Sequence, residues 1–177
     1  MRQIVLLRGI NLGSHNRIAM PALREALTGA GFEDVRTYLQ SGNVVLASDA
    51  TPERLAAQCE HLIADAFGLT LSVIVRTRDE LADVVRRNPL ADVAVNPKRY
   101  QVTFLAAELD SEEVEKLAAL AAPSERFTTI GREVYAWHPD GVARSRLWAR
   151  LAGQGLGLSA TSRNWTTVTN LVAIAGE

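Results

Sequence analysis

The feature that most constrains the fold of this 177-residue chain is a pattern of predicted elements that occurs twice, each time around a tight hairpin. In the first half, segments 35–39 and 44–47 flank Gln40-Ser-Gly-Asn43, where a glycine beside an asparagine supplies the positive φ of a tight reversal. In the second half, segments 126–130 and 134–137 flank Gly131. Because hairpins join antiparallel strands, both halves need antiparallel sheets, which argues against a doubly wound parallel fold.

The other elements follow from helix signals and apolar periodicity. A helix from Met20 carries a proline in its first turn, and another follows the capping residue Thr51 and Pro52. Asp110 is the predicted cap of a third helix, with Glu113 in capping-box position. The expected strands are 3–7, 35–39, 44–47, 71–75, 100–105, 126–130 and 134–137, and the expected helices are 20–27, 52–67, 79–87, 111–120, 144–151 and 164–175.

We therefore predict an α+β protein of two ferredoxin-like (α-β plait) subdomains with antiparallel sheets, from a repeated β-α-β-β-α unit. Two Asx-Pro pairs, Asn88-Pro89 and Asn96-Pro97, mark an irregular connection between the halves. The predicted boundaries are 1–78 for the first subdomain, 79–97 for a connecting helix and linker, and 98–177 for the second subdomain.

Composition restricts the class of partner. The chain has 19 basic and 20 acidic side chains and a net charge of -1, which is too balanced for a protein that coats a polyanion. Strand 44–47 has none of the stacking aromatic residues of RNA-binding plaits, and the aromatic pairs that alternate along strands of the second half, Tyr100 with Phe104 and Tyr135 with Trp137, are typical of packing under helices. Neither RNA nor DNA is therefore an expected partner. The apolar run near the amino terminus is four residues long, too short for a signal peptide or a membrane span, so we expect no membrane association.

The reactive side chains give no cofactor or metal signature. The single cysteine, Cys59, falls on an apolar helix face, which is typical of a buried small hydrophobe, and one thiol fits a cytoplasmic, reducing location. The three histidines, His15, His61 and His138, lack metal-ligand spacing. Neither a Walker loop nor a Gly-x-Ser-x-Gly elbow is present, and we expect no cofactor.

Three polar clusters are candidate binding residues, and each also has a purely structural interpretation. The loop after the first strand can hold an anion with backbone N–H groups and arginine side chains, or be a surface loop. The first hairpin turn can present amides and a hydroxyl, or simply reverse the chain. The last helix starts at a cluster in which Asn164 can be a helix cap, whereas Arg163 and Trp165 have no evident structural role. The candidate ligand-binding residues are Arg8, Asn11, Arg17, Gln40, Ser41, Asn43, Arg163, Asn164 and Trp165.

Three segments resemble a known family. They are Leu6-Leu-Arg-Gly-Ile-Asn-Leu-Gly13, Arg36-Thr-Tyr-Leu-Gln-Ser-Gly-Asn-Val-Val45 and Thr161-Ser-Arg-Asn-Trp-Thr-Thr-Val-Thr169, and together they look like the bacterial domain of unknown function 1697 family. The resemblance implies a cytoplasmic bacterial protein with two α-β plait subdomains and implies no activity. Ser14 and His15 stand where relatives often have further Gly or Lys residues, which argues against a lysine-dependent role for this loop.

The three segments of the resemblance coincide with the three polar clusters, which favours one composite site. The leading hypothesis is a binding module for a small anionic or nucleotide-like ligand. One alternative is a phosphate-ester or acyl-phosphate hydrolase, in which Arg17 would cradle phosphate and Asn43 would orient water, by analogy with other ferredoxin-like proteins. The other is a protein-interaction module, which requires an exposed apolar patch.

Overall fold

A computed structural model describes residues 1–153 and 155–177 and divides the chain into two compact units. The first unit comprises Met1–Asp83 and Asn170–Glu177, and the second comprises Val84–Thr169. Each contains a four-stranded antiparallel sheet, which confirms the predicted α+β class with duplicated ferredoxin-like architecture. This division falls within two helices, between residues 83 and 84 and between residues 169 and 170, and the boundaries after residues 78 and 97 stay a sequence-based prediction.

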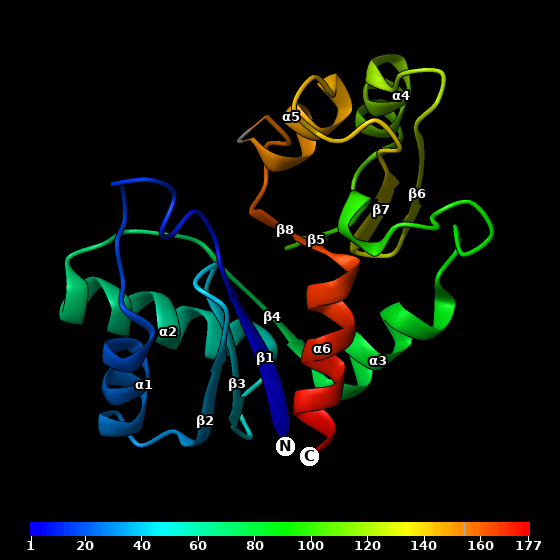
Figure 1. The fold of residues 1–177 in the computed structure, drawn as a ribbon. Coiled ribbons are helices and arrows are strands. Elements are labelled where there is room, and N and C mark those ends of the chain that lie inside the picture. Colours follow the sequence, from blue (N-terminus) through cyan, green and yellow to red (C-terminus); the bar gives the residue numbers. More distant parts are fainter. Residues whose placement is uncertain (154) are drawn as a thin grey trace. The chain divides into compact units, whose positions relative to one another are not determined.

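The sheet of the first unit has the strand order β2-β3-β1-β4. Two helices cover one face of this sheet (Figure 1), and apolar side chains of both helices form a single core with that face. The elements are β1 (Arg2–Leu7), α1 (Met20–Gly29), β2 (Glu33–Tyr38), β3 (Asn43–Ala47), α2 (Pro52–Phe67) and β4 (Val73–Thr77), followed by α3 (Arg78–Arg87), which crosses into the second unit.

Local signals in the sequence account for the ends of these elements. The Thr51 hydroxyl accepts a hydrogen bond of 3.2 Å from the Arg54 N–H, and Gly68 ends α2 in the left-handed conformation at φ 67°. In the first hairpin, Gly42 has φ 88°, and a Cβ there would lie 2.8 Å from Ile10 Cδ1 and from Leu7 Cβ. The turn therefore requires glycine for its φ and for its close packing.

The second unit repeats the arrangement with the strand order β6-β7-β5-β8. Its two helices also lie on one face of the sheet (Figure 1), over a core that includes Leu105, Leu117 and Leu147. The elements are the 3₁₀ turn η1 (Pro97–Arg99), β5 (Tyr100–Leu105), α4 (Ser111–Leu120), β6 (Arg126–Ile130), β7 (Glu133–Trp137), α5 (Arg146–Ala152) and β8 (Ala160–Asn164), followed by α6 (Trp165–Gly176), which crosses into the first unit.

The strand β8 is an addition to the predicted strands, because the sequence predicts no strand directly before the last helix. Its residues, Ala-Thr-Ser-Arg-Asn, show almost no apolar pattern, yet they pair with β5 from Gln101↔Asn164 to Leu105↔Ala160. The strand therefore exists because a distant partner pairs with it, and the second half completes the same β-α-β-β-α-β order as the first.

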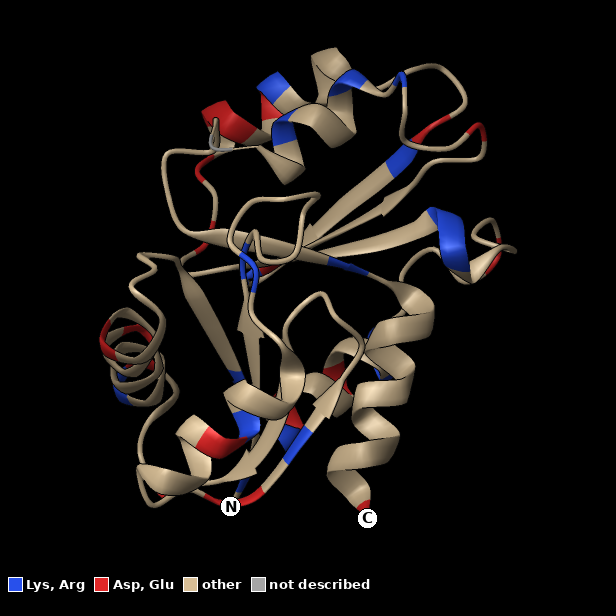
Figure 2. Ribbon diagram, turned by 60° about the vertical axis from the view of Figure 1, so that its left-hand side comes forward, with Lys and Arg blue, Asp and Glu red and all other residues tan. Residues whose placement is uncertain are grey.

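The last eight residues of the chain belong to the first unit. The Asn170 side chain donates a 2.7 Å hydrogen bond to the Tyr38 hydroxyl, and Arg36 forms an ion pair with Glu177 at 2.5 Å. Figure 2 shows no charged residue along the ribbon of α6, and acidic colour follows only at the terminal Glu177, after the helix ends. No described helix has both the length and the apolarity needed to cross a membrane.

Candidate functional site

One asparagine, Asn11, links the loop between β1 and α1 to the β2–β3 turn by hydrogen bonds and so forms a joint between loop and turn. Asn11 Nδ2 donates to the carbonyl oxygens of Ile18 at 2.9 Å and Gln40 at 2.6 Å, and its Oδ1 accepts from the Ile18 N–H at 2.9 Å. Asn11 itself is in the left-handed region at φ 54°. The structure thus brings together Asn11 and Gln40, which come from different polar clusters of the sequence.

A pocket of about 410 Å³ opens beside this joint. One of its walls is the start of α1, where Ala19 is the N-cap, no side chain of the described residues caps the helix and the first turn has no acidic residue. The free N–H groups at a helix start and the helix dipole give such a wall a partial positive charge, although Pro21 itself contributes no N–H group. The lining residues are Asn11, Arg17, Ile18, Ala19, Met20, Pro21 and Gln40.

Arg17 is the residue of the pocket lining that carries a formal positive charge. Its side chain is exposed, and Nη1 donates to the Gly13 carbonyl at 2.8 Å, which orients the guanidinium within the loop. A guanidinium has five N–H donors, so this bond leaves donors that can reach a ligand. Arg8 is half-buried after the end of β1 and is not among the residues that line the pocket.

Two further candidates of the hairpin turn bond to each other. Asn43 is fully buried, and its Nδ2 donates to the Tyr38 carbonyl at 2.7 Å and to the Ser41 hydroxyl at 2.9 Å. Neither Ser41 nor Asn43 lines the pocket. In this structure both side chains therefore hold the turn that presents Gln40.

The three candidates from the last cluster belong to the second unit, and each has a structural contact. Arg163 is buried and donates from Nη1 to Thr161 Oγ1 at 2.7 Å and to the Ser162 carbonyl at 2.9 Å; burial lowers the pKa of its guanidinium to about 10. Asn164 Oδ1 accepts from the Thr167 N–H at 2.9 Å and caps α6. These bonds supply a role that sequence reasoning did not find for Arg163.

Trp165 also has a packing role that the sequence did not indicate. Its ring stacks on Tyr100, with 4.8 Å between centroids and 29° between planes, and lies 6.4 Å from the ring of Tyr135. It stays a prediction that Trp165, Arg163 and Asn164 belong to one site with the polar residues of the first unit.

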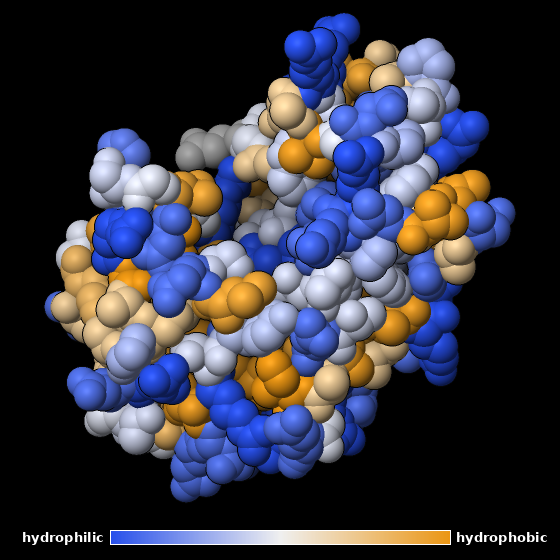
Figure 3. All heavy atoms as spheres, viewed as in Figure 1, coloured by the Kyte–Doolittle hydropathy of each residue, from blue (hydrophilic) through white to orange (hydrophobic). Residues whose placement is uncertain are grey.

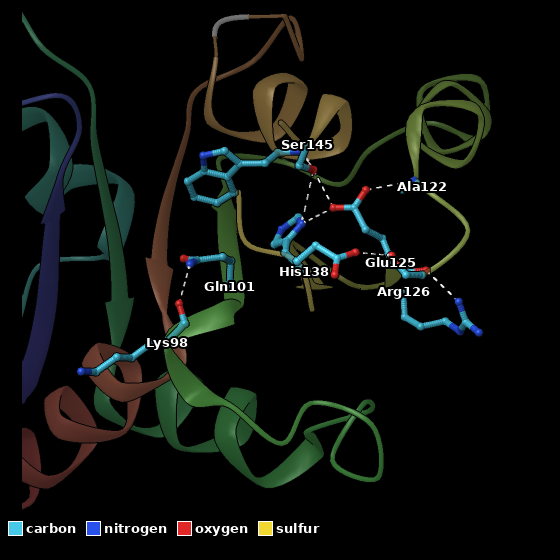
Figure 4. Close-up of polar contacts among 10 residues, drawn as sticks. Lys98, Gln101, Ala122, Glu125, Arg126, His138 and Ser145 are labelled. Carbon is cyan, nitrogen blue, oxygen red and sulfur yellow. Dashed lines mark hydrogen bonds and ion pairs between the residues drawn. The ribbon is translucent and has the colours of Figure 1, made fainter. Parts of the chain in front are cut away.

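Sequence reasoning missed a buried polar cluster at the open end of the second hairpin (Figure 4). Glu125 Oε2 lies 2.5 Å from His138 Nδ1 and accepts a 2.6 Å hydrogen bond from the Ser145 hydroxyl, while Oε1 accepts from the Ala122 N–H at 2.9 Å. The hairpin register pairs Arg126 with Trp137, which sets Glu125 opposite His138. The predicted hairpin could therefore have revealed this pair, because Glu125 directly precedes its first strand and His138 directly follows its second strand.

The bonds of this cluster indicate a structural rather than a catalytic role. Burial raises the pKa of the Glu125 carboxyl, but hydrogen bonds from Ser145, Ala122 and His138 outweigh that effect and bring the pKa below its ordinary value. A carboxylate with a lowered pKa is a poor general base. The Ser145 hydroxyl also accepts from the Trp148 N–H at 3.0 Å as the N-cap of α5, so it stabilises a helix start.

The repeated β-α-β-β-α-β order and the two antiparallel sheets define a duplicated ferredoxin-like α+β protein, with a polar loop after its first strand. The chain belongs to the DUF1697 family of proteins of unknown function, and the family match covers residues 1–135. This confirms the family resemblance, although the third resembling segment lies beyond the matched residues.

The fold is also similar to a solved structure, that of the conserved bacterial protein SP0830 from Streptococcus pneumoniae. The TM-score is 0.75 over 98% of each chain, and the sequence identity is 22%, so this likeness concerns the fold alone. No curated protein matches the chain.

Proposed function

We propose that this protein binds a small anionic ligand in the pocket between the β1–α1 loop and the β2–β3 turn. The observation that carries the proposal is the convergence on one pocket of the Arg17 guanidinium, the Asn11 and Gln40 residues and the uncapped start of α1. The positive charge and the helix N-terminus both favour an anion over a neutral or cationic ligand.

The loop conformation supports a binding role. Of the four non-glycine residues with positive φ among those described, Asn11, Asn16 and Leu39 belong to this loop and turn. Such conformations cost on the order of 1–3 kcal/mol each and persist where the surroundings fix them, often at ligand-binding positions. The Asn11 bonds to Ile18 and Gln40 fix the pocket wall before any ligand arrives, which reduces the ordering cost of binding.

The experiment is isothermal titration calorimetry of the full chain with inorganic phosphate at low ionic strength. Arg17→Gln should weaken binding roughly tenfold to a hundredfold, because a hydrogen bond to a charged group contributes about 1.5–3 kcal/mol. The matched control is Arg24→Gln: Arg24 is an exposed arginine of α1 that donates to Thr37 Oγ1 at 2.7 Å and does not line the pocket. An equal loss in both variants, or no binding of either inorganic phosphate or a phosphate monoester by the natural chain, would rule out this site.

Hydrolysis of phosphate esters or acyl phosphates is the alternative activity. It would require Asn43 to orient a water molecule, but that side chain is buried and donates to Tyr38 and Ser41. We therefore propose ligand binding rather than hydrolysis. Release of phosphate from acetyl phosphate by the natural chain, lost in Arg17→Gln, would instead favour the hydrolase.

A further inference from the structure

We infer that the ligand of this pocket is a phosphate monoester with an apolar or planar body, such as a nucleoside or alkyl phosphate, rather than inorganic phosphate. The inference rests on the proposed anion site and specifies the chemical class of its ligand. It comes from the apolar residues of the pocket lining and from two exposed leucines that are sequence neighbours of lining residues, none of which the anion hypothesis alone uses.

Two leucines stand exposed at the joint of loop and turn. Leu12 is 67% exposed and Leu39 is 53% exposed. Leu12 follows Asn11 and Leu39 precedes Gln40, and these two neighbours line the pocket and are hydrogen-bonded to each other at 2.6 Å. The loop and the turn therefore each carry a solvent-exposed leucine directly beside a residue that lines the pocket.

The backbone at Leu39 strengthens this observation. It has φ 61°, a conformation that glycine and asparagine adopt far more readily than leucine. Neither burial nor local conformational preference accounts for a leucine at this turn position. A ligand that covers the side chain would account for it, since burying exposed apolar surface is favourable.

The pocket itself is amphipathic. Ile18, Ala19, Met20 and Pro21 form apolar lining, whereas Arg17 and the two amide residues supply polar lining. Figure 3 shows hydrophobic and hydrophilic side chains side by side at its upper left, where Figure 1 places the β1–α1 loop. A ligand whose anionic group is bound by Arg17 can thus place its apolar body against the lining and the exposed leucines. Inorganic phosphate would leave this apolar surface uncovered.

The test compares ligands that share one phosphate group. Calorimetry of the full chain would use inorganic phosphate, octyl phosphate and adenosine 5′-monophosphate, each at the same ionic strength. We expect at least one monoester to bind tenfold or more tightly than inorganic phosphate. In the double variant Leu12→Asn, Leu39→Asn this advantage should fall to less than threefold. Asparagine suits the positive φ at position 39, so the variant should fold.

The matched control is Val93→Asn, Val95→Asn, which removes an exposed apolar pair of the second unit (37% and 80% exposed) and should preserve the monoester advantage. Equal affinities for inorganic phosphate and both monoesters would overturn the inference while the anion site stands, and absence of all binding would overturn both. Cosedimentation with phosphatidic acid vesicles distinguishes the source of the phosphate: binding to vesicles without binding to octyl phosphate would overturn the inference in favour of a lipid surface.

Discussion

Arg76 and Arg163 occupy equivalent positions in the two units. Each is the fourth residue of a five-residue last strand, and each pairs with the third residue of the first strand of its sheet, Ile4 in β1 and Val102 in β5. Both arginines are buried, with 2% and 7% of their surface exposed. The internal repeat therefore extends from the order of elements to the placement of a buried guanidinium.

The residue after each arginine extends this equivalence. Thr77 Oγ1 accepts from the Glu80 N–H at 3.1 Å at the start of α3, and Asn164 Oδ1 accepts from the Thr167 N–H at 2.9 Å at the start of α6. Each of the two plaits is therefore followed directly by a helix that the last strand residue caps. The repeated unit is β-α-β-β-α-β-α, one strand and one helix longer than the β-α-β-β-α unit predicted from the sequence.

The substitution Asn11→Asp should loosen the candidate pocket. It keeps the shape of the side chain but replaces the Nδ2 donor with a carboxylate oxygen that faces the Ile18 and Gln40 carbonyls. Loss of these bonds should lower the free energy of unfolding by about 1–3 kcal/mol, measured by urea unfolding, and should speed amide exchange of the loop. Asn16→Asp adds the same charge to the same loop and removes one 3.2 Å bond to Gly9. If both variants weaken phosphate binding equally, the added negative charge is responsible, and not the loss of the Asn11 hydrogen bonds to Ile18 and Gln40.

The substitution Gly42→Ala should strongly destabilise the first unit. An alanine would adopt φ 88° and place its Cβ 2.8 Å from Ile10 Cδ1 and Leu7 Cβ, so conformational strain and overpacking together should cost about 2–5 kcal/mol. The matched control is Gly68→Ala. Gly68 has φ 67°, and a Cβ there would meet no atom within 4 Å, so only conformational strain of about 1–2 kcal/mol applies. Equal shifts of the denaturant midpoint in the two variants would contradict the predicted steric clash.

Glu125 should contribute a stability that depends on pH. Because hydrogen bonds outweigh burial and lower its pKa from 4.5, its stabilising contribution is present above about pH 4.5 and is lost as the pH falls through the lower pKa of the folded state. Glu125→Gln should cost about 1–3 kcal/mol near neutral pH and should flatten the decline in stability below pH 4.5. Glu108→Gln, at an exposed position, should retain the decline of the natural chain. Unfolding in urea between about pH 3 and 7 measures both, and parallel curves for the natural chain and Glu125→Gln would contradict the assignment.

The sequence predicts those parts of the fold that depend on neighbouring residues. The caps at Thr51 and Asp110 are confirmed, because each side-chain oxygen accepts a hydrogen bond, of 3.2 Å and 2.8 Å, from the N–H group three residues later. The glycine at position 42 has the expected positive φ. Such features depend on the residue itself and on a few neighbours. The strand β8 could not be predicted in this way, because it is defined by pairing with β5, about 60 residues away.

The candidate site could likewise be predicted from the sequence only in part. The sequence singles out polar loops, but which side chains reach a ligand depends on backbone conformation and burial. Asn11 turns back to its own loop from a positive φ, and Asn43 is buried in its turn. The exposure of Leu12 and Leu39 also depends on the folded loop and turn, so these two exposed leucines were not predicted.

Cys59 should react with thiol reagents only when the first unit opens. Its side chain is 1% exposed, and burial, with a smaller effect of the Glu60 charge, raises the pKa of the thiol to about 12. The reactive thiolate is therefore scarce and inaccessible in the folded protein. We expect Ellman's reagent at about pH 8 to modify this cysteine quickly in about 6 M guanidinium chloride and very slowly in buffer. Leu55→Ala, which removes a buried side chain of the same helix, should destabilise the fold by about 2–5 kcal/mol and raise the slow rate by a factor of roughly thirty or more. Gln58→Ala, at an exposed position of α2, should leave that rate unchanged; modification of the natural folded chain as fast as the denatured one would show that the thiol is accessible.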